Sequence, residues 1–371
     1  MSKEYSSKDN EQRFGRTLRD DFHQVRIKED LKSEYKDLKD YFLTEERKEK
    51  LKSMSSFKRF FVVPFWLFKT LYFKLTPFRR ILLIAGLIFL FLSVRSETNS
   101  DDVSINIQIF GILSGLTFLF IIALELKDKM FAKTELEEGR AIQKALMPET
   151  HPEVNGWDIW LFTNPANDVG GDLLDFLTIS ENKIGISVGD VAGKGLSAAL
   201  LMAKLQSTIR AIVPDYKSLE ELGKKLNRIF CRDSLPRLFA SLVYLEINTG
   251  SGNIKLLNAG HLPPIAIKDK KINKLNSTSP ALGIIPEADF REQKVELNKN
   301  DFLVIYSDGL VEARDESGEF YGEKRLEICL NKLPDLTAQA IGELILRNVN
   351  GFIGKAKAHD DLTLAILKKS S

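Results

Sequence analysis

The clearest chemical signature lies at Gly189 and Asp190, within the run IGISVGDVAGKG at residues 184–195. The apolar residues 184–188 predict a strand that ends in a carboxylate between glycines, and a helix is predicted from about Leu196. Glycine-rich turns let the backbone approach a charged ligand, which is either a phosphate or a cation. The P-loop spacing of Gly to Gly-Lys-Ser/Thr is absent, and Asp190 would repel an anion. The stretch therefore favours a cation site.

Three further segments place acids at the ends of predicted strands. They are Gly170-Gly171-Asp172 followed by Asp175, Tyr306-Ser307-Asp308-Gly309, and His359-Asp360-Asp361. A single aspartate at a strand end is usually a turn former or a helix cap, and that explanation covers each segment taken singly. Gathered carboxylates repel each other and are poorly hydrated, so they persist mainly by sharing cations. Oxygen-only ligand sets select Mg²⁺ or Mn²⁺, so the repeated pattern predicts an acidic cluster that binds such ions.

No side chain is paired with an adjacent base to form a nucleophile. Of the four histidines, His23 lies in the charged N-terminal region and His151 in a predicted loop. His261 follows a predicted strand in the run Asn258-Ala259-Gly260-His261, where it either lines the site as a general acid or is a buried hydrogen-bonding residue. A histidine without a catalytic partner favours the structural role.

Composition excludes some classes of protein. The 371 residues carry a net charge of +2 and show no basic stripe interleaved with aromatics in the C-terminal part, so nothing points to nucleic-acid binding. The two cysteines, Cys231 and Cys329, do not have metal-ligand spacing. A zinc site or a disulfide framework is therefore not expected, and a reducing compartment is the simpler inference.

The N-terminal region divides into blocks that predict a membrane protein. Residues 1–56 are rich in charges of both signs and are predicted to be helical or disordered, with no signal peptide. Residues 57–80 combine aromatic with basic residues, which is typical of a membrane-interface segment. Two apolar runs within residues 81–126 predict a transmembrane helical hairpin. A buried hairpin in a soluble domain is the alternative.

The charges that flank the two apolar runs predict the topology. Basic residues precede the first run and follow the second, whereas the connection is acidic. By the positive-inside rule, we expect a multi-pass protein of the cytoplasmic membrane with its N-terminus and catalytic domain in the cytoplasm. Residues 127–150 predict a linker helix that Pro148 stops. Its apolar stripe fits either a homodimer seam or a passive spacer.

The remaining residues, 151–371, predict one globular domain. Strands are predicted at residues 157–162, 173–179, 183–188, 239–247, 253–258, 265–268, 302–307 and 362–367, and helices at 196–213, 218–232, 323–331 and 337–352. Strands that cluster around a central helix pair, with more helices after them, predict an α+β layered sandwich rather than a parallel βαβ sheet.

A set of motifs makes the expectation specific. In chain order they are IQKALMP, NPANDVGGDLLDF, GDVAGKGLSAAL, FASL, NAGHLPP, YSDGLVEARDESGEFYG and DDLTL. Over residues 136–368 the set resembles the bacterial PPM-type (PP2C-like) serine/threonine phosphatases of the RsbU/SpoIIE class. The resemblance implies an αββα sandwich of two antiparallel sheets with a centre of two Mn²⁺ or Mg²⁺ ions.

The resemblance also implies residue roles. The metal ligands would be Asp172, Asp190, the Val191 carbonyl, Asp308, Asp360 and Asp361, of which Asp190, Asp308 and Asp360 are the catalytic set. Asp175, Asn258 and His261 would line the site, and the turn Gly193, Lys194, Gly195 and Leu196 would be regulatory. Relatives often carry an aromatic at Leu174, and more distant phosphatases carry Asp at His261, which puts a third metal site in doubt.

The implied activity is hydrolysis of phosphoserine or phosphothreonine by a metal-activated water. The implied substrate is a phosphorylated STAS-type anti-anti-sigma protein in a partner-switching pathway that regulates a sigma factor. A non-catalytic membrane scaffold of the same fold is the alternative, and the intact acidic positions argue against it. A metal-dependent nucleotidyl cyclase, prompted by Gly-Gly-Asp, is less favoured because it gives no role to the Ser-Asp-Gly and Asp-Asp motifs.

Overall fold

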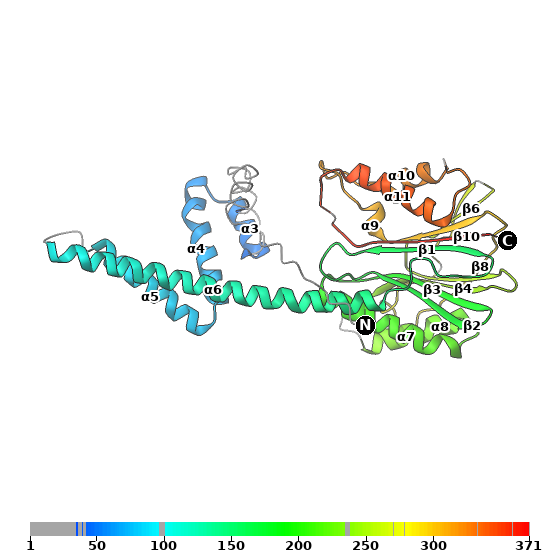
Figure 1. Cartoon of the computed structure of the whole chain (residues 1–371), viewed down its shortest axis with the longest axis horizontal. Coiled ribbons are helices and arrows are strands. Elements are labelled where there is room, and N and C mark those ends of the chain that lie inside the picture. The colour runs from blue at the N-terminus through cyan, green and yellow to red at the C-terminus, as the bar shows by residue number, and fades with distance from the viewer. Residues whose placement is uncertain are drawn as a thin grey trace, which may run out of the picture. The chain divides into compact units, whose positions relative to one another are not determined.

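A computed structural model describes residues 35, 39, 42–95, 101–233, 238–269, 271–277, 279–331, 333–357 and 359–370. Most of the predicted N-terminal segment 1–56 lies outside these residues. The chain divides into two compact units, Met1–Lys129 and Met130–Ser371. Figure 1 shows the elements of both units.

The second unit contains two five-stranded antiparallel sheets. In the first sheet the order is β1 (Trp157–Asn164), β10 (Leu362–Lys369), β9 (Phe302–Tyr306), β6 (Ile265–Lys268) and β7 (Lys271–Lys274). In the second it is β2 (Leu173–Ser180), β3 (Lys183–Val191), β4 (Ala240–Asn248), β5 (Ile254–Ala259) and β8 (Glu292–Val295).

Helices cover the outer face of each sheet (Figure 1). On the second sheet lie α7 (Leu196–Ile212), the 3₁₀ turn η1 (Val213–Asp215) and α8 (Leu219–Asp233). On the first sheet lie the short α9 (Asp308–Val311), α10 (Gly322–Asn331) and α11 (Ala338–Ile353). The layers therefore follow the order helix, sheet, sheet, helix, which confirms the predicted αββα sandwich.

Alternation along the strands sorts the side chains into layers. In β3, Ile184, Ile186 and Val188 belong to the core between the two sheets. In β9, Leu303 and Ile305 join that core, whereas the alternate residues pack beneath the outer helices. Successive side chains in a strand point to opposite faces, so Asp190 continues the series that faces the space between the sheets.

The structure differs from the predicted elements at the ends and at the sheet edges. β3 continues to Val191 because Asp190 and Val191 pair with Ser241 and Ala240 of β4. The sequence analysis missed β7 and β8, which have four residues each and mostly polar side chains that give no clear apolar pattern. Within the described residues, neither Cys231 nor Cys329 forms a disulfide bond.

The first unit contains α3 (Glu45–Lys52), α4 (Ser56–Lys74) and α5 (Pro77–Arg95), and most of α6 (Asp101–Leu146). Antiparallel contacts join α5 to α6. Arg79 forms ion pairs of 2.7 Å and 2.6 Å with Glu125 and Asp128, and the Ser114 hydroxyl donates a 3.0 Å hydrogen bond to the Gly86 carbonyl. The predicted hairpin is thus a packed pair of helices.

Among the described residues, two helical segments are long and apolar enough to cross a membrane, Ile109–Leu146 and Leu196–Asp215. The first includes most of the second predicted apolar run. The second is α7 with η1, whose apolar side chains pack on the second sheet of the globular unit. Length and composition alone therefore do not separate a spanning helix from a core helix here.

Candidate metal centre and active site

Neighbouring strand ends carry the acids that the sequence analysis singled out. Asp172 precedes β2 and Asp190 lies near the end of β3, which are neighbours in one sheet. Asp308 follows β9, and the pair Asp360 and Asp361 precedes β10, which are neighbours in the other sheet. Electrostatic interactions join Asp190 to Asp172, Asp308, Asp360 and Asp361, so the five carboxylates predicted as metal ligands meet at one edge of the sandwich.

Burial and mutual repulsion disfavour the charged forms of these acids. Burial, followed by repulsion from Asp308 and Asp360, raises the pKa of Asp190 to about 7. Burial and then repulsion from Asp360 raise the pKa of Asp308. Burial and then the charge of Asp190 raise the pKa of Asp172 well above its usual range. The cluster holds more negative charge than the protein alone can solvate.

One buried oxygen in this cluster fits a cation. Asp172 is buried, and its Oδ2 has no hydrogen-bond partner among the described residues. Buried polar atoms are normally satisfied, and a carboxylate oxygen is a ligand that Mg²⁺ and Mn²⁺ prefer. Within the described ranges, no group of three or more His, Cys, Asp or Glu side chains is arranged to hold a metal ion. The assignment of individual ligands stays a prediction.

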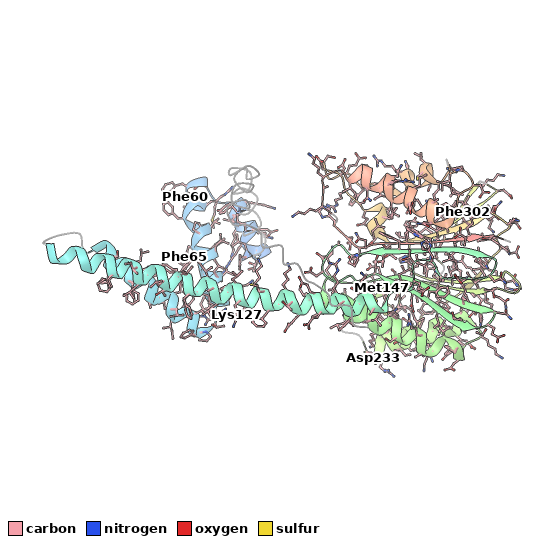
Figure 2. The ribbon with its side chains drawn as sticks, in the orientation of Figure 1. Phe60, Phe65, Lys127, Met147, Asp233 and Phe302 are labelled. Carbon is pink, nitrogen blue, oxygen red and sulfur yellow. The ribbon has the colours of Figure 1, made fainter. Side chains whose placement is uncertain are left out.

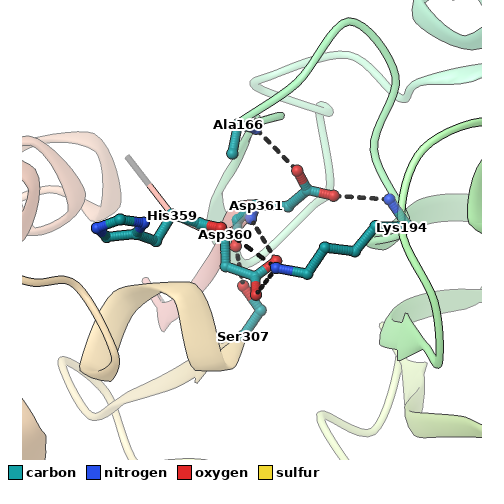
Figure 3. Close-up of polar contacts among 7 residues, drawn as sticks. Ala166, Lys194, Ser307, His359, Asp360 and Asp361 are labelled. Carbon is teal, nitrogen blue, oxygen red and sulfur yellow. Dashed lines mark hydrogen bonds and ion pairs between the residues drawn. The ribbon is translucent and has the colours of Figure 1, made fainter. Parts of the chain in front are cut away.

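Backbone donors occupy the carboxylate of Asp361. Its Oδ1 accepts a 2.8 Å hydrogen bond from the Ala166 N–H, and its Oδ2 accepts one of 2.6 Å from the Gly171 N–H (Figure 3). The side chain thereby ties the start of β10 to the loop that carries Asp172. We therefore assign Asp361 a positioning role, which sequence spacing did not distinguish from metal binding.

Ser307 holds the same region from the other side. Its hydroxyl accepts a 2.9 Å hydrogen bond from the Thr363 N–H and donates one of 3.1 Å to the Asp361 carbonyl. Ser307 is fully buried, so these bonds fix Asp308 relative to Asp361. The sequence analysis placed Ser307 in the motif but gave it no role, since a serine before an aspartate carries no distinctive signal.

The predicted regulatory turn reaches the acids through Lys194. Its ammonium lies 3.3 Å from Asp360 Oδ2 and 3.4 Å from the His359 carbonyl (Figure 3). Gly193 and Gly195 have φ angles of +124° and +66°, which residues other than glycine rarely adopt. The turn then enters α7 at Leu196, which is exposed. A single short turn therefore joins β3 to α7 and places a cation beside the acids.

Asp175 does not line the site, contrary to the expectation. It is buried on β2, where it accepts hydrogen bonds of 2.9 Å and 2.6 Å from Arg210 of α7. Gln206 donates to the same carboxylate at 3.0 Å and to the Leu146 carbonyl at 2.9 Å. The charge of Asp175 therefore connects β2, α7 and the end of α6.

The linker helix contacts the metal-site loop through Gln143. Its side-chain amide donates a 2.7 Å hydrogen bond to the Gly170 carbonyl, and its carbonyl accepts one of 3.0 Å from the Gly170 N–H. Gln143 is buried, and Gly170 precedes the residue that Asp361 holds. Sequence alone gave no role to Gln143, which belongs to the motif IQKALMP and lies in the apolar stripe of the linker helix. A polar residue in such a stripe is the signal that would have marked it.

His261 has a structural environment, as the sequence favoured. Its Nδ1 lies 2.7 Å from the Ser241 hydroxyl and its Nε2 lies 3.2 Å from the Tyr306 carbonyl. A carbonyl only accepts, so Nε2 carries the proton and Nδ1 accepts from Ser241. Burial lowers the pKa of His261 to about 4, which leaves the ring neutral near pH 7.

Asn258 does not line the site either. It is completely buried, and its side chain accepts a 2.9 Å hydrogen bond from the His261 N–H and donates one of 3.2 Å to the His261 carbonyl. These bonds close the turn that carries His261. Asn258 therefore has a structural role in this turn.

His261 should make the globular unit less stable in acid. Its pKa of about 4 is below the usual 6.5, so the unfolded chain binds the extra proton first as pH falls between these values. Linkage predicts that this group removes about 2 kcal/mol of stability between pH 7 and pH 5. Urea unfolding of residues 130–371 at both pH values should show that difference relative to His261→Gln. An identical pH dependence in both proteins would contradict the burial of a neutral ring.

Comparison with known proteins agrees with this geometry. The family profile described as Stage II sporulation protein E (SpoIIE) matches residues 180–370. The chain is 32% identical over 190 residues to the phosphoserine phosphatase RsbP of Bacillus subtilis, covering 50% of this chain and 47% of RsbP. It is 29% identical over 272 residues to Protein IcfG of Synechocystis, covering 66% of this chain and 43% of IcfG. The chain thus spans less than half the length of these two relatives.

A further relative and two solved structures cover the same region. The phosphoserine phosphatase RsbU of Bacillus subtilis is 27% identical over 242 residues, which is 64% of this chain and 70% of RsbU. The SiaA-PP2C domain of Pseudomonas aeruginosa superposes with a TM-score of 0.57 at 18% identity, covering 65% of this chain and 98% of that domain. The structure of the PP2C phosphatase domain and a fragment of the regulatory domain of SpoIIE from Bacillus subtilis superposes with a TM-score of 0.52 at 18% identity. It covers 58% of this chain and 64% of that chain.

These likenesses agree with the two stacked sheets of the globular unit. The family match covers more than half of the chain, and the solved structures share its αββα layers. The chain therefore belongs to the SpoIIE family, and its globular unit has the PP2C fold.

Proposed function

We propose that this protein is a metal-dependent phosphatase that hydrolyses phosphoserine or phosphothreonine in proteins. The observation that supports this most is the buried acidic cluster at the edge of a PP2C fold, with the unpartnered oxygen of Asp172 inside it. Two relatives, RsbP and RsbU, carry the name phosphoserine phosphatase. The Ser241 hydroxyl lies beside His261, but that ring is buried and hydrogen-bonded to the Tyr306 carbonyl. We therefore assign hydrolysis to metal ions, because metal-assisted hydrolysis needs no side-chain nucleophile.

We assign two roles to the acidic residues, metal binding and positioning of the loops. Asp172, Asp190, Asp308 and Asp360, with the Val191 carbonyl, would hold the two Mn²⁺ or Mg²⁺ ions that the family resemblance implies. When bound, such ions lower the pKa of a water molecule and neutralise phosphoryl oxygens. Asp361 and Ser307 keep the backbone of the two acidic loops in register. Gln143 holds Gly170 in the same arrangement from the linker helix.

The direct test is turnover by the full chain in detergent and by residues 130–371. Both should hydrolyse p-nitrophenyl phosphate and a phosphoserine peptide with Mn²⁺, and neither should do so after chelation and removal of the ions. Metal-independent turnover would contradict the proposal. Metal binding without turnover of either substrate would favour the non-catalytic scaffold.

The proposed substrate is a phosphorylated STAS-domain regulator of a partner-switching pathway. Similarity to RsbU and RsbP supports this class of substrate. A phosphorylated STAS-domain protein should lose its phosphate faster than an unrelated phosphoserine protein at equal concentration. Equal rates for the two proteins would remove the support for this substrate.

We also propose that α5 and α6 anchor the protein in the cytoplasmic membrane, with the N-terminus and the globular unit in the cytoplasm. The apolar stretch that begins at Ile109 and the charge distribution around the hairpin support this location. The chain should resist extraction from membranes by carbonate and be cleaved by protease only from the cytoplasmic face. Release by carbonate would contradict it.

The linker helix is a candidate homodimer seam. Met130 and Ile142 expose 62% and 67% of their surface along this helix. A cysteine at position 142 in the full chain should form an intermolecular disulfide if the seam exists. A cysteine at position 133, which Lys133 occupies on the same helix, serves as the matched control. Equal crosslinking at both positions would contradict a specific seam.

Gln143→Ala should raise the Mn²⁺ concentration needed for half-maximal turnover about tenfold. The substitution removes two buried hydrogen bonds to Gly170, worth about 1 kcal/mol each, and so loosens the loop that carries Asp172. The neighbouring Lys144→Ala removes an exposed side chain and should leave the Mn²⁺ dependence unchanged. Activity titrated with Mn²⁺ measures the shift. Coincident curves for Gln143→Ala and wild type would disprove the role of this contact.

A further inference from the structure

Helix α4 carries an exposed aromatic surface. Its 19 residues include four basic residues and no acidic one. Six phenylalanines of α4 expose between 46% and 76% of their surface, and Phe73 in its last turn is one of them. The other five are Phe57, Phe60, Phe61, Phe65 and Phe68. We call these five residues the α4 aromatic face. The rings of Phe57 and Phe60 each contact Phe61, with centroid distances of 5.4 Å and 5.2 Å, so they form a continuous patch.

The other side of α4 is already covered by the chain that precedes it. Val63 is buried in a small cluster with Leu43 and Leu51, and Trp66 packs against the same cluster. Arg47 of α3 lies over the Trp66 ring at 5.5 Å and donates a 3.2 Å hydrogen bond to the Thr70 hydroxyl. Phe60, labelled in Figure 2, lies at the border of the two sides of α4, where it lines a pocket with Leu51 and Lys52 of α3. The helix therefore has one protein-covered face and one aromatic face without a protein cover among the described residues.

The length and charges of α4 argue against a third membrane span. Only nine residues, 60–68, separate Arg59 from Lys69. A helix needs about 20 apolar residues to cross the hydrocarbon core. A helix that has one side covered by protein, and an exposed apolar stripe flanked by basic residues on the other, instead lies along a membrane surface.

The start of α5 holds the end of α4. Only Leu75 and Thr76 separate the two helices. The Arg80 guanidinium of α5 donates hydrogen bonds of 3.1 Å and 2.7 Å to the Tyr72 and Phe73 carbonyls, the last turn of α4. The helix that carries the aromatic face is thus connected directly to the proposed membrane hairpin, at the end of the hairpin where the first turn of α5 contains Arg79 and Arg80.

We propose that α3 and α4 form a surface-binding module that docks the α4 aromatic face onto a bilayer containing anionic lipids. Phenylalanine rings at the headgroup boundary bury apolar surface without crossing the core. Lys58 and Lys69 are eleven residues apart, about three helical turns, so they lie along the same edge of the face. There their charges meet anionic headgroups, which attract basic residues near the membrane surface.

Charge and continuity favour lipid over a protein partner. Every charged residue of α4 is basic, and the helix leads within two residues into the proposed span. The inference rests on the proposed membrane location and is independent of the proposed catalysis. It adds a lipid preference that an apolar hairpin alone does not give.

The test uses the full chain in nanodiscs, with Cys231 and Cys329 replaced by alanine. An environment-sensitive fluorophore is attached to Phe61→Cys on the aromatic face, or to Lys50→Cys on α3 as the control. Lipids that carry a doxyl group near the headgroup should quench the probe at position 61 and leave the probe at position 50 bright. Adding phosphatidylglycerol to phosphatidylcholine should increase the quenching at position 61.

The charge variants show whether the lysines act as proposed. Lys58→Gln with Lys69→Gln should abolish the increase with phosphatidylglycerol, whereas Lys50→Gln with Lys52→Gln removes the same charge from α3 and should preserve it. If the probe at position 61 of the embedded chain stays unquenched in both lipids, the inference is overturned. It is also overturned if both double variants lose the phosphatidylglycerol-dependent increase in quenching to the same extent. A chain that stays in solution without lipid or detergent would instead contradict the membrane location itself.

Discussion

Asp190→Asn should reduce turnover of p-nitrophenyl phosphate at saturating Mn²⁺ by about a thousandfold, which corresponds to about 4 kcal/mol of transition-state stabilisation. Asparagine keeps the shape of the side chain and removes its charge. Asp190 lies on a strand that is paired through Val191, so the loss would come from charge and not from displaced backbone. Asp289→Asn, at a side chain with 84% exposure, is the matched control and should retain full turnover.

The same substitution should not lower the stability of the metal-free protein. Burial and neighbouring acids raise the pKa of Asp190 to about 7, so the folded state disfavours its charge. A group with a raised folded-state pKa stabilises at low pH and loses that contribution as pH rises through the folded value. Above pH 7, metal-free Asp190→Asn should therefore be at least as stable as wild type in urea unfolding. Lower stability together with lost turnover would indicate simple misfolding.

Gly309→Ala should reduce Mn²⁺-dependent turnover about a hundredfold and lower stability by about 1–3 kcal/mol. A Cβ at this position would overlap the carbonyl oxygen of Asp361 and lie 2.8 Å from its carbonyl carbon. The Asp361 segment cannot move freely because its carboxylate is bonded to Ala166 and Gly171. Either Asp308 or the pair Asp360 and Asp361 must therefore shift.

Gly351→Ala is the control for this effect. Gly351 lies in α11, and a Cβ there would meet no atom within 4 Å. The substitution should preserve turnover and, because alanine favours a helix, stabilise the unit by up to about 1 kcal/mol. Turnover and urea unfolding of both variants measure the contrast. Wild-type turnover in Gly309→Ala would show that the close packing of the two acidic loops is unimportant.

The fold could be predicted because its strands have strong local signals. The sequence predicts strands with an apolar face, such as β2 and β9, to within one residue at each end, and the motif resemblance supplies their arrangement. β7 and β8 were missed because edge strands of four residues with charged side chains bury little apolar surface. β3 was ended too early because a carboxylate inside a paired strand looks like a strand end in sequence.

The candidate site was predictable only as a set of residue types. The four acidic segments were identified, and the structure brings them to one edge. Spacing could not show that Asp361 bonds to backbone donors, that Asp175 pairs with Arg210, or that Asn258 closes a turn. Each of those roles depends on a partner at least three residues away whose position only the folded chain determines. Gln143 was missed as a functional residue for the same reason.

Calorimetry of Mn²⁺ binding to residues 130–371, without substrate, is the most direct test of the proposed metal centre. The wild-type unit should bind Mn²⁺, and Asp190→Asn and Asp172→Asn should each weaken binding by at least about tenfold, or about 1.4 kcal/mol. Asp289→Asn should bind like wild type. Absence of Mn²⁺ and Mg²⁺ binding by the wild-type unit, or unchanged binding by Asp190→Asn, would contradict the metal centre.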